Sequence, residues 1–531
     1  MLEPTSKPTI THKLAANIGR NTLFGVVARV TQVSTRLVTV PIVISHLGLG
    51  GYGIWAIVMT TAAYMRFGSI GVKSAFQKYV AEATGNGDFE TANRLLSTGC
   101  AVMLAISLAG LLPIALFSRE LATLAGVPSE FLASAAHSFT MLAIIMVISN
   151  VGAVYEAIVM GGHRVDLARN FSTFFTVAEA VAIVVLLHFG AGLFAMASVM
   201  AASEVGFIAS CYLASKKILP QIRLSLRHVT KSVVRELVRF AGSYQLVNVL
   251  EVLYISIVPF TVLRMFGADS AGIYALTTRL VGAALMLPDA LLLPVLSGGA
   301  MVFAAGSTSE MRTLITKSFK VTLALGLLPL GFIAMFGPKI VFAWTGEVAP
   351  ALAAAFCLVC VAALFQSISL LGLVLYRTSG KALLDNIRQV LRIITLLCVT
   401  IAARHLGFLG VLAGFALVEL FGMLFMLFAL TKAFEAFRVR ALLPDALRST
   451  AATVVILCAA GTTFLLPIPV LSSARLAAAI QLAAVSFAGL VVAWPALVLT
   501  KSITSTEGRA LMDALLPSRD RLKSRPIEMA S

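Results

Sequence analysis

Long apolar stretches, separated by short polar breaks, run through almost the whole chain. Most are about 18–28 residues long, and about 20 apolar residues in a helix cross the hydrocarbon core of a bilayer. The pattern predicts an all-α polytopic membrane protein with about fourteen transmembrane helices. The expected spans are 18–45, 52–72, 96–117, 134–158, 171–188, 192–214, 238–263, 272–303, 318–337, 350–376, 389–403, 407–431, 450–470 and 476–499.

Two local patterns refine this outline. The stretch 272–303 is long and contains Pro288 and Pro294, and a proline inside a helix kinks or breaks it. We therefore expect an interruption there. The polar segment 73–95 has Phe76 and Val80 at helical spacing, which predicts a short amphipathic helix at the membrane boundary.

The composition agrees with a protein that lies mostly in the bilayer. Hydrophobic residues make up 59% of the chain and charged residues only 12%, whereas about 25% is usual for soluble domains. The connections between the spans are short, so we expect no folded domain outside the membrane. The six cysteines lie in apolar surroundings without accompanying ligands, and we predict neither a metal site nor a cofactor.

The basic residues predict the orientation. With the N-terminus in the cytoplasm, most of the 41 Lys and Arg residues fall on cytoplasmic segments, including Arg388 and Arg392 in segment 377–392. The opposite side holds only Arg119, Arg264, Lys339, Arg404 and Arg475. The positive-inside rule then places both termini in the cytoplasm. The net charge of +17 is explained by this topology and by anionic lipid headgroups, so we expect no nucleic-acid partner.

A weak internal repeat divides the chain. Gly53-Ile-Trp-Ala opens the second span and Gly272-Ile-Tyr-Ala opens the eighth, 219 residues later. Two six-span repeats of equal orientation imply a pseudo-two-fold axis along the membrane normal and a site between the halves. The predicted parts are an N-tail (1–17), an N-lobe (18–215), a basic linker (216–237), a C-lobe (238–431), a loop with spans 13 and 14 (432–500) and a C-tail (501–531).

Charged residues inside the spans are the candidate functional residues, because each is costly unless it faces a cavity or a partner. Arg29 and Arg36 share one face of the first span with Gln32, while Arg66 and Arg279 lie in the second and eighth spans. Arginine suits bidentate contacts to phosphate oxygens. The alternative is pairing with intramembrane acids, for which the candidates are Glu156, Glu179, Glu204, Glu251, Asp289 and Glu419.

The seventh span carries a polar stripe of Tyr244, Asn248, Glu251 and Tyr254. Tyr244 and Asn248 are candidates for binding a polar substrate. Glu251 either binds a proton or Na⁺ or pairs with an arginine, and Asp289 and Glu419 are weaker candidates for ion coupling. No arrangement of catalytic residues stands out, and we do not expect an enzyme.

The run from Gly48 to Ala56, together with Lys78–Glu82 and Gly87–Leu95, resembles the polysaccharide flippases. These are the Wzx-like, PST-type members of the multidrug/oligosaccharidyl-lipid/polysaccharide (MOP) exporter superfamily. The resemblance implies a MATE-like fold of two six-helix lobes around a central cavity. It also implies a substrate, an undecaprenyl-diphosphate-linked oligosaccharide, carried across the bacterial inner membrane for surface or exopolysaccharide biosynthesis.

In such a flippase, cationic cavity residues engage the diphosphate-sugar headgroup, and the intramembrane arginines are the natural positions here. Alternating access of the two lobes would carry the headgroup across. Membrane lipids, a polysaccharide polymerase and glycosyltransferases are the expected partners. The lipid II flippase of the same superfamily has two extra C-terminal helices that form a lipid groove, and the resemblance suggests the same role for spans 13 and 14.

Two other functions remain open at this point. An ion-coupled multidrug antiporter has the same fold and differs in the charge of its cavity. An integral-membrane polysaccharide polymerase or ligase is a more distant alternative, because such enzymes need a larger loop with catalytic residues.

Overall fold

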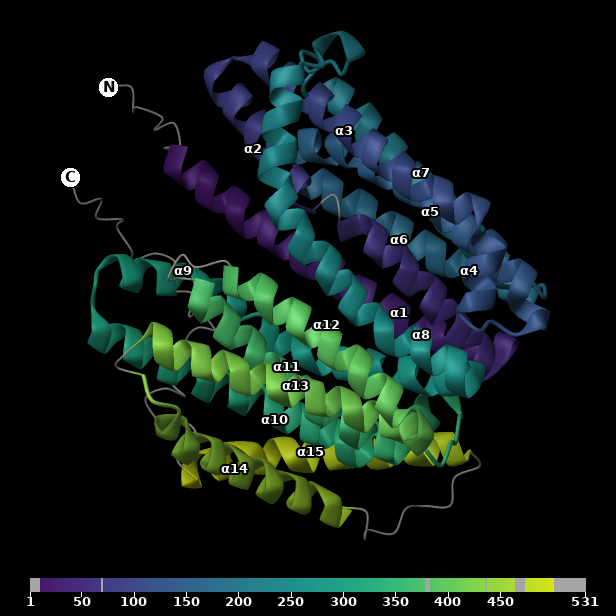
Figure 1. The fold of residues 1–531 in the computed structure, drawn as a ribbon, viewed down its shortest axis with the longest axis vertical. Helices are drawn as coiled ribbons and strands as arrows, with labels where there is room; N and C mark the ends of the chain where they lie inside the picture. The colour runs from purple at the N-terminus through teal and green to yellow at the C-terminus, as the bar shows by residue number, and fades with distance from the viewer. Residues whose placement is uncertain (1–9, 68–69, 378–382, 435–436, 464–472, 501–531) are drawn as a thin grey trace, which may run out of the picture. The chain divides into compact units, whose positions relative to one another are not determined.

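The structure is a computed structural model that describes residues 10–67, 70–377, 383–434, 437–463 and 473–500 (Figure 1). Within these ranges all regular structure is helical. The helices are α1 (Ile10–Phe67), α2 (Ile70–Asn86), α3 (Phe89–Leu116), α4 (Ser118–Leu124), α5 (Ser129–Gly161), α6 (Val165–His188), α7 (Leu193–Ile218), η1 (Leu226–His228), α8 (Lys231–Asp289), α9 (Leu292–Ala304), α10 (Thr308–Thr345), α11 (Leu352–Arg377), α12 (Leu383–Ala403), η2 (Arg404–Leu406), α13 (Gly407–Ala433), η3 (Val439–Leu442), α14 (Leu443–Thr462) and α15 (Ala474–Leu499).

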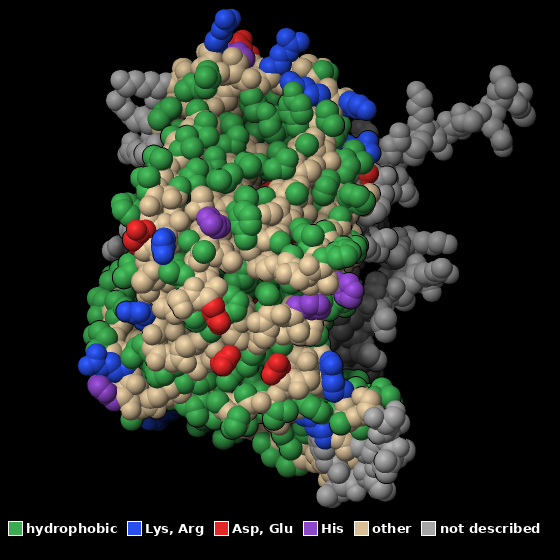
Figure 2. Space-filling model, turned by 90° about the vertical axis from the view of Figure 1, so that its right-hand side faces the viewer, with side chains coloured by type: hydrophobic (Ala, Val, Ile, Leu, Met, Phe, Trp, Pro, Cys, Tyr) green, Lys and Arg blue, Asp and Glu red, His purple; other side chains and the backbone are tan. Residues whose placement is uncertain are grey.

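Eleven helical segments of the described residues are long and apolar enough to cross a membrane. Three of them contain a break at a left-handed glycine: Thr31–Thr60 at Gly48, Leu250–Met286 at Gly267 and Ile387–Ala433 at Gly407. Each of these three corresponds to two predicted spans, which reconciles the eleven segments with the expected fourteen. In Figure 2 apolar side chains cover much of the face in view, and Lys and Arg side chains lie at several places over it.

The chain divides into two compact units. The first consists of Met1–Leu276 and Asp385–Val411, and the second of Thr277–Leu384 and Leu412–Ser531. These bounds differ from those of the predicted lobes, 18–215 and 238–431, because helix α12 groups with the first unit. The division into two lobes with an appended pair of spans stays a prediction.

In the first unit α5 packs between α3 and α7, and α1 packs on α6 (Figure 1). The expected amphipathic helix is present as α2, whose Phe76 and Val80 are almost fully buried. It ends at Asn86 instead of running to residue 95, because the Asp88 carboxylate caps a new helix by accepting a hydrogen bond from Thr91 N at 3.0 Å.

In the second unit α10 packs on α11, and the last two long helices, α14 and α15, lie side by side and contact α10 (Figure 1). Polar contacts join α15 to α10: Lys339 Nζ donates to Gln481 Oε1, and Arg475 donates to the Trp344 carbonyl at 2.8 Å. The expected interruption of 272–303 is confirmed, since α8 ends at Asp289 and α9 begins at Leu292.

The predicted repeat has a counterpart in backbone geometry. The kinks of α1 and α8 lie at Gly48 (φ 71°, ψ 173°) and Gly267 (φ 84°, ψ 178°), which are 219 residues apart. The same offset relates the N-caps Asp88 and Ser307. Because a left-handed residue is strained unless it is glycine, these matched kinks support a duplicated helical frame.

The repeat motifs also meet in space, within the first unit. A Cβ added to Gly53 would lie 2.5 Å from the Ala268 carbonyl oxygen, and one added to Gly272 would lie 2.3 Å from the Leu49 oxygen. Leu49 and Ala268 are themselves related by the 219-residue offset, so the contact is reciprocal, as across a two-fold axis. Helices α1 and α8 thus cross backbone to backbone, which only small residues permit.

The linker between α7 and α8 is bound along α3. Arg223 N donates to Asn93 Oδ1 at 2.8 Å, and Asn93 Nδ2 donates to the Gln221 carbonyl at 3.2 Å. Further along, Ser225 N donates to Ser97 Oγ at 3.1 Å. Leu219 and Ile222 are buried in the same core as Phe76 and Val80. Residues 219–230, which lie within the predicted linker, therefore form a strap along α3, and its Arg223 and Arg227 side chains are exposed.

Candidate functional site: a polar cluster between two membrane helices

Helix α12 is inverted relative to a helix of a soluble protein. Its polar residues Arg388, Gln389 and Arg392 are at most 5% exposed, whereas its apolar residues are largely exposed. The exposed ones are Ile387, Val390, Leu391, Ile394, Leu397 and Ile401. An apolar outer face is what lipid requires, and buried polar groups in a membrane helix need partners within the protein. The polar face of α12 is therefore the first place to look for chemistry.

The partner of this face within the first unit is α8. Gln389 Nε2 donates a hydrogen bond to Glu251 Oε2 at 2.6 Å, and Gln389 Oε1 accepts one from Arg392 Nη1 at 3.1 Å. The Gln389 amide thus connects the Glu251 carboxylate to the Arg392 guanidinium. Because a glutamine amide has a donor and an acceptor, it satisfies both charged groups at once.

An aromatic ring completes the cluster. The Arg392 guanidinium carbon lies 3.9 Å from the centroid of the Tyr254 ring, and Tyr254 is 2% exposed. A cation over a ring at this distance is stabilised, most strongly when both are shielded from water. Glu251 and Tyr254 are one turn apart on α8, as are Gln389 and Arg392 on α12, so two helix faces meet in register.

This arrangement corrects one interpretation and bears on another. Arg388 and Arg392 were assigned to a polar segment between spans; the structure places them inside α12, which begins at Leu383. The alternatives for Glu251 were ion binding and pairing with an arginine. In the structure it is joined to an arginine through Gln389, and its carboxylate is half-buried.

The other predicted site residues fall in different places. Gln32 and Arg279 are half-buried, on α1 and α8. Asp289 is exposed at the end of α8, and Glu419 is fully buried in α13. Gln32 and Glu251 belong to the first unit, and Arg279, Asp289 and Glu419 to the second. The side chains of Arg29, Arg36, Arg66, Tyr244 and Asn248 lie outside those that the structure describes.

The repeat relates several of these positions. An offset of 219 takes Gln32 to Glu251 and Arg29 to Asn248. The same offset takes Asn170, on α6, to Gln389, on α12. The pair α8–α12 is thus the counterpart of the pair α1–α6, which also packs together. Sequence reasoning missed Gln389 and Arg392 as site residues. Arg388 and Gln389 precede Arg392 by four and three residues, and this spacing indicates one polar face of a helix.

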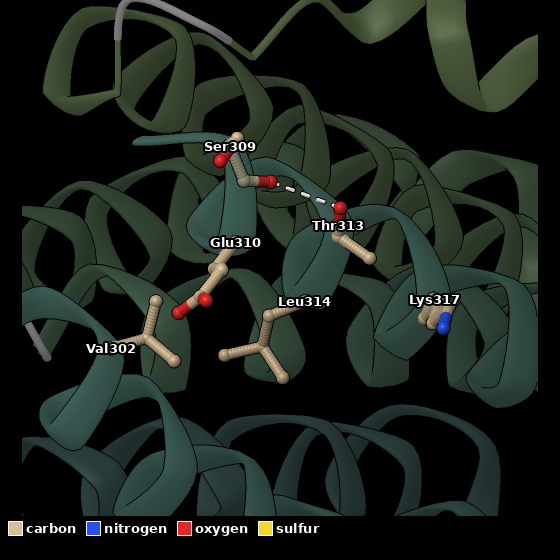
Figure 3. A pocket seen from close by; sticks show the side chains of 6 residues that line it. All are labelled: Val302, Ser309, Glu310, Thr313, Leu314 and Lys317. Atoms are coloured by element: carbon tan, nitrogen blue, oxygen red, sulfur yellow. Dashed lines mark hydrogen bonds between the residues drawn. The ribbon is translucent and has the colours of Figure 1, made fainter. Parts of the chain in front are cut away.

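A separate hollow lies in the second unit, at the start of α10 (Figure 3). Glu310 points into it beside Val302 and Leu314, and Lys317 lies further along the same helix. The Thr313 hydroxyl donates to the Ser309 carbonyl at 2.9 Å and is thereby satisfied within the helix. None of the predicted site residues lines this hollow.

Known proteins can now be compared with this geometry. The MatE family model matches residues 26–177, from within α1 to within α6. No curated protein matches the chain in sequence.

Solved structures match over most of the chain. An inward-facing multidrug resistance MATE family transporter of the MOP superfamily has a TM-score of 0.64 at 15% identity, covering 76% of this chain and 95% of its own. The lipid II flippase MurJ, in an inward closed conformation, has a TM-score of 0.62 at 14% identity, covering 89% and 97%. The chain therefore has a MATE-like fold.

A third structure with this fold shows how its use varies. It is a MOP superfamily transporter from Pyrococcus furiosus Vc1, described as having a binding pocket of reversed polarity that suggests a different function. It matches with a TM-score of 0.51 at 13% identity, covering 79% of this chain and 94% of its own. These neighbours are described as transporters and a flippase, and the eleven candidate spans among the described residues agree with a multi-pass membrane protein.

Proposed function

We propose that this chain is a flippase that carries an undecaprenyl-diphosphate-linked oligosaccharide across the bacterial inner membrane by alternating access. The observation that carries the proposal is the buried basic face of α12. Arg388 and Arg392 are both buried in a membrane helix, and Arg392 belongs to the polar cluster that also contains Glu251. A positive site favours an anionic diphosphate headgroup, and guanidinium groups bind phosphate oxygens in a bidentate manner.

The physical need for such a protein is clear. A diphosphate sugar loses its hydration in the hydrocarbon core, and that loss is too costly for unaided crossing. Polar groups of the protein replace the water while the prenyl chain stays in lipid. Arg29, Arg36, Arg66 and Arg279 would add to the positive potential, with Gln32, Tyr244 and Asn248 as hydrogen-bonding groups. The fold shared with a lipid II flippase supports a lipid-linked substrate.

A second function, an ion-coupled drug antiporter, is favoured by a different observation. Glu251 is an acid within a membrane helix, half-buried and hydrogen-bonded to a neutral amide, and such acids serve proton or Na⁺ coupling in transporters. The fold shared with a multidrug transporter fits this equally well. Under the flippase proposal Glu251, Asp289 and Glu419 are the candidates for ion coupling.

One experiment separates the two functions. In a deletion strain, plasmids carry the wild type, Arg392→Gln or Arg404→Gln, the last being a control at an exposed arginine just beyond α12. We expect Arg392→Gln to reduce surface polysaccharide at least about tenfold, the effect of about 1.4 kcal/mol at a transport barrier. Lipid-linked oligosaccharide should then accumulate on the cytoplasmic face.

Drug tolerance and the amount of protein in the membrane are measured in the same strains. A loss of tolerance to cationic drugs with unchanged polysaccharide would establish the antiporter instead. A variant that is absent from the membrane would be replaced by Arg388→Gln, which leaves the Gln389 bridge intact.

A further inference from the structure

A groove of about 690 Å³ opens between α6 and α7 in the first unit. Its walls are mostly apolar and include Leu167, Phe171 and Leu213. Two cationic side chains, Arg164 and Lys217, also line it. Both belong to helix ends, Arg164 just before α6 and Lys217 in the last turn of α7. The groove therefore has a charged end and an apolar length.

The groove lies where a lipid would. Leu213 is 62% exposed and belongs to the candidate membrane span Leu193–Ile218, so it faces the hydrocarbon region. The charged end coincides with the end of that span, on the side where the basic residues predict the cytoplasmic boundary. A ligand here would have its polar part at the interface and its apolar part along the helices.

Arg164 is held at the charged end of the groove. Its backbone is fixed to the end of α5, since its N–H donates to the Val159 carbonyl at 3.1 Å. Its guanidinium donates to both carboxylate oxygens of Asp166, at 3.2 and 3.5 Å, while the arginine side chain stays half exposed. Two of the five N–H groups of an arginine are used in this pair, so three remain for a phosphate.

We propose that this groove binds an anionic diacyl phospholipid, with its phosphate between Arg164 and Lys217 and an acyl chain along Phe171 and Leu213. The occupant follows from charge complementarity joined to an apolar wall. A soluble phosphate would gain nothing from the wall, and a zwitterionic lipid would gain little from two cations. Each basic residue at the cytoplasmic leaflet raises the affinity for anionic lipid about fivefold.

The test uses the purified full-length protein, stripped of lipid and titrated with phosphatidylglycerol or phosphatidylcholine under native mass spectrometry. We expect one phosphatidylglycerol to be retained more tightly than phosphatidylcholine. The double variant Arg164→Gln/Lys217→Gln should weaken that binding about 25-fold, from about fivefold per cation. Both side chains are exposed, so the fold is not at risk.

The chain offers a matched control. Lys216 is the neighbour of Lys217, carries the same charge and is also exposed, but its Nζ lies 5.5 Å from the Tyr212 ring centroid and it does not line the groove. Lys216→Gln should leave phosphatidylglycerol retention unchanged. Equal effects of Lys216→Gln and Lys217→Gln, or equal retention of both lipids, would overturn the proposal. So would competition by sn-glycerol 3-phosphate as effective as that by the lipid, because the acyl chain would then be irrelevant.

Discussion

The two helix pairs α1–α6 and α8–α12 occupy the same place in the two repeats, yet they carry different chemistry. The matched positions are Gln32 with Glu251, Thr35 with Tyr254, Asn170 with Gln389 and Thr173 with Arg392. The first pair is uncharged at all four positions. In the second pair an amide connects an acid to a base, and the base lies over an aromatic ring. A duplicated backbone therefore does not imply a duplicated site, and the chemistry has to be sought in the differences.

The largest expected difference between the pairs is at Arg392. Arg392→Leu removes the donor to Gln389 Oε1 and the cation over the Tyr254 ring, and the loss of a charged group from a buried polar network should cost about 3 kcal/mol of unfolding free energy. Thr173→Val removes only a hydroxyl that bonds to the Arg169 carbonyl of its own helix at 2.9 Å. That change should stay within about 0.5 kcal/mol.

The measurement is denaturant unfolding of both variants in the same mixed micelles. Equal losses of stability for the two variants would mean that the cluster of the second pair has no energetic role beyond ordinary packing.

A smaller effect is expected when Gln389 is compared with Asn170, its matched position in the first repeat. Gln389 is fully buried, and Gln389→Leu should cost about 1–3 kcal/mol of unfolding free energy. The Glu251 carboxylate and the buried Arg392 guanidinium would each lose a hydrogen-bond partner. Asn170 is exposed, so Asn170→Leu should have almost no effect on stability. A double-mutant cycle of Gln389→Leu with Glu251→Gln should give a coupling above about 0.5 kcal/mol. Additive losses would show that the carboxylate and the amide act independently.

The smallest effect distinguishes the N-caps of the two repeats. Hydrogen bonds from Thr91 lower the pKa of the Asp88 carboxyl below its ordinary value of 3.8. Its cap is therefore fully formed above pH 3.8 and is lost as the pH falls through the lower folded-state pKa. The equivalent cap of α10 is the hydroxyl of Ser307, which accepts from Glu310 N at 3.4 Å and does not titrate.

Amide hydrogen exchange between pH 6 and pH 3 checks this difference. The protection factor of the Thr91 amide should fall at the acidic end, while the protection factor of the Glu310 amide should depend much less on pH. Identical pH profiles at both amides would contradict the assignment of the Asp88 cap.

Sequence patterns were sufficient for the fold and for the frame of the repeat. Hydropathy located the membrane segments because a span must be apolar over its whole length. The Gly53 and Gly272 motifs located the repeat, and the structure places those glycines in reciprocal contact. The proline-rich end of α8 was located as well, since Pro288 precedes the break by a few residues.

The partners of Glu251 were not predictable in the same way. Hydropathy averaged along the chain assigns Arg388 and Arg392 to a loop. A membrane helix that buries a polar face has the same low mean hydropathy as a segment at the membrane boundary, so the average does not distinguish the two. Which acid meets which base depends on the approach of α8 and α12, and no local pattern specifies that approach. Near a predicted end of a membrane span, the spacing of polar residues therefore indicates a buried polar helix face better than their number does.

The strap formed by residues 219–230 has a mechanical consequence. A connection of this length, if free, would give the segments on either side of it slack to separate. Here side chains of α3 bond the strap backbone at four points, and the residues are Asn93, Ser97 and Thr98. The strap therefore cannot extend while these hydrogen bonds remain. Displacement of α8 relative to α3 must therefore start at Lys231 as bending of the helix itself, or be preceded by peeling of the strap from α3.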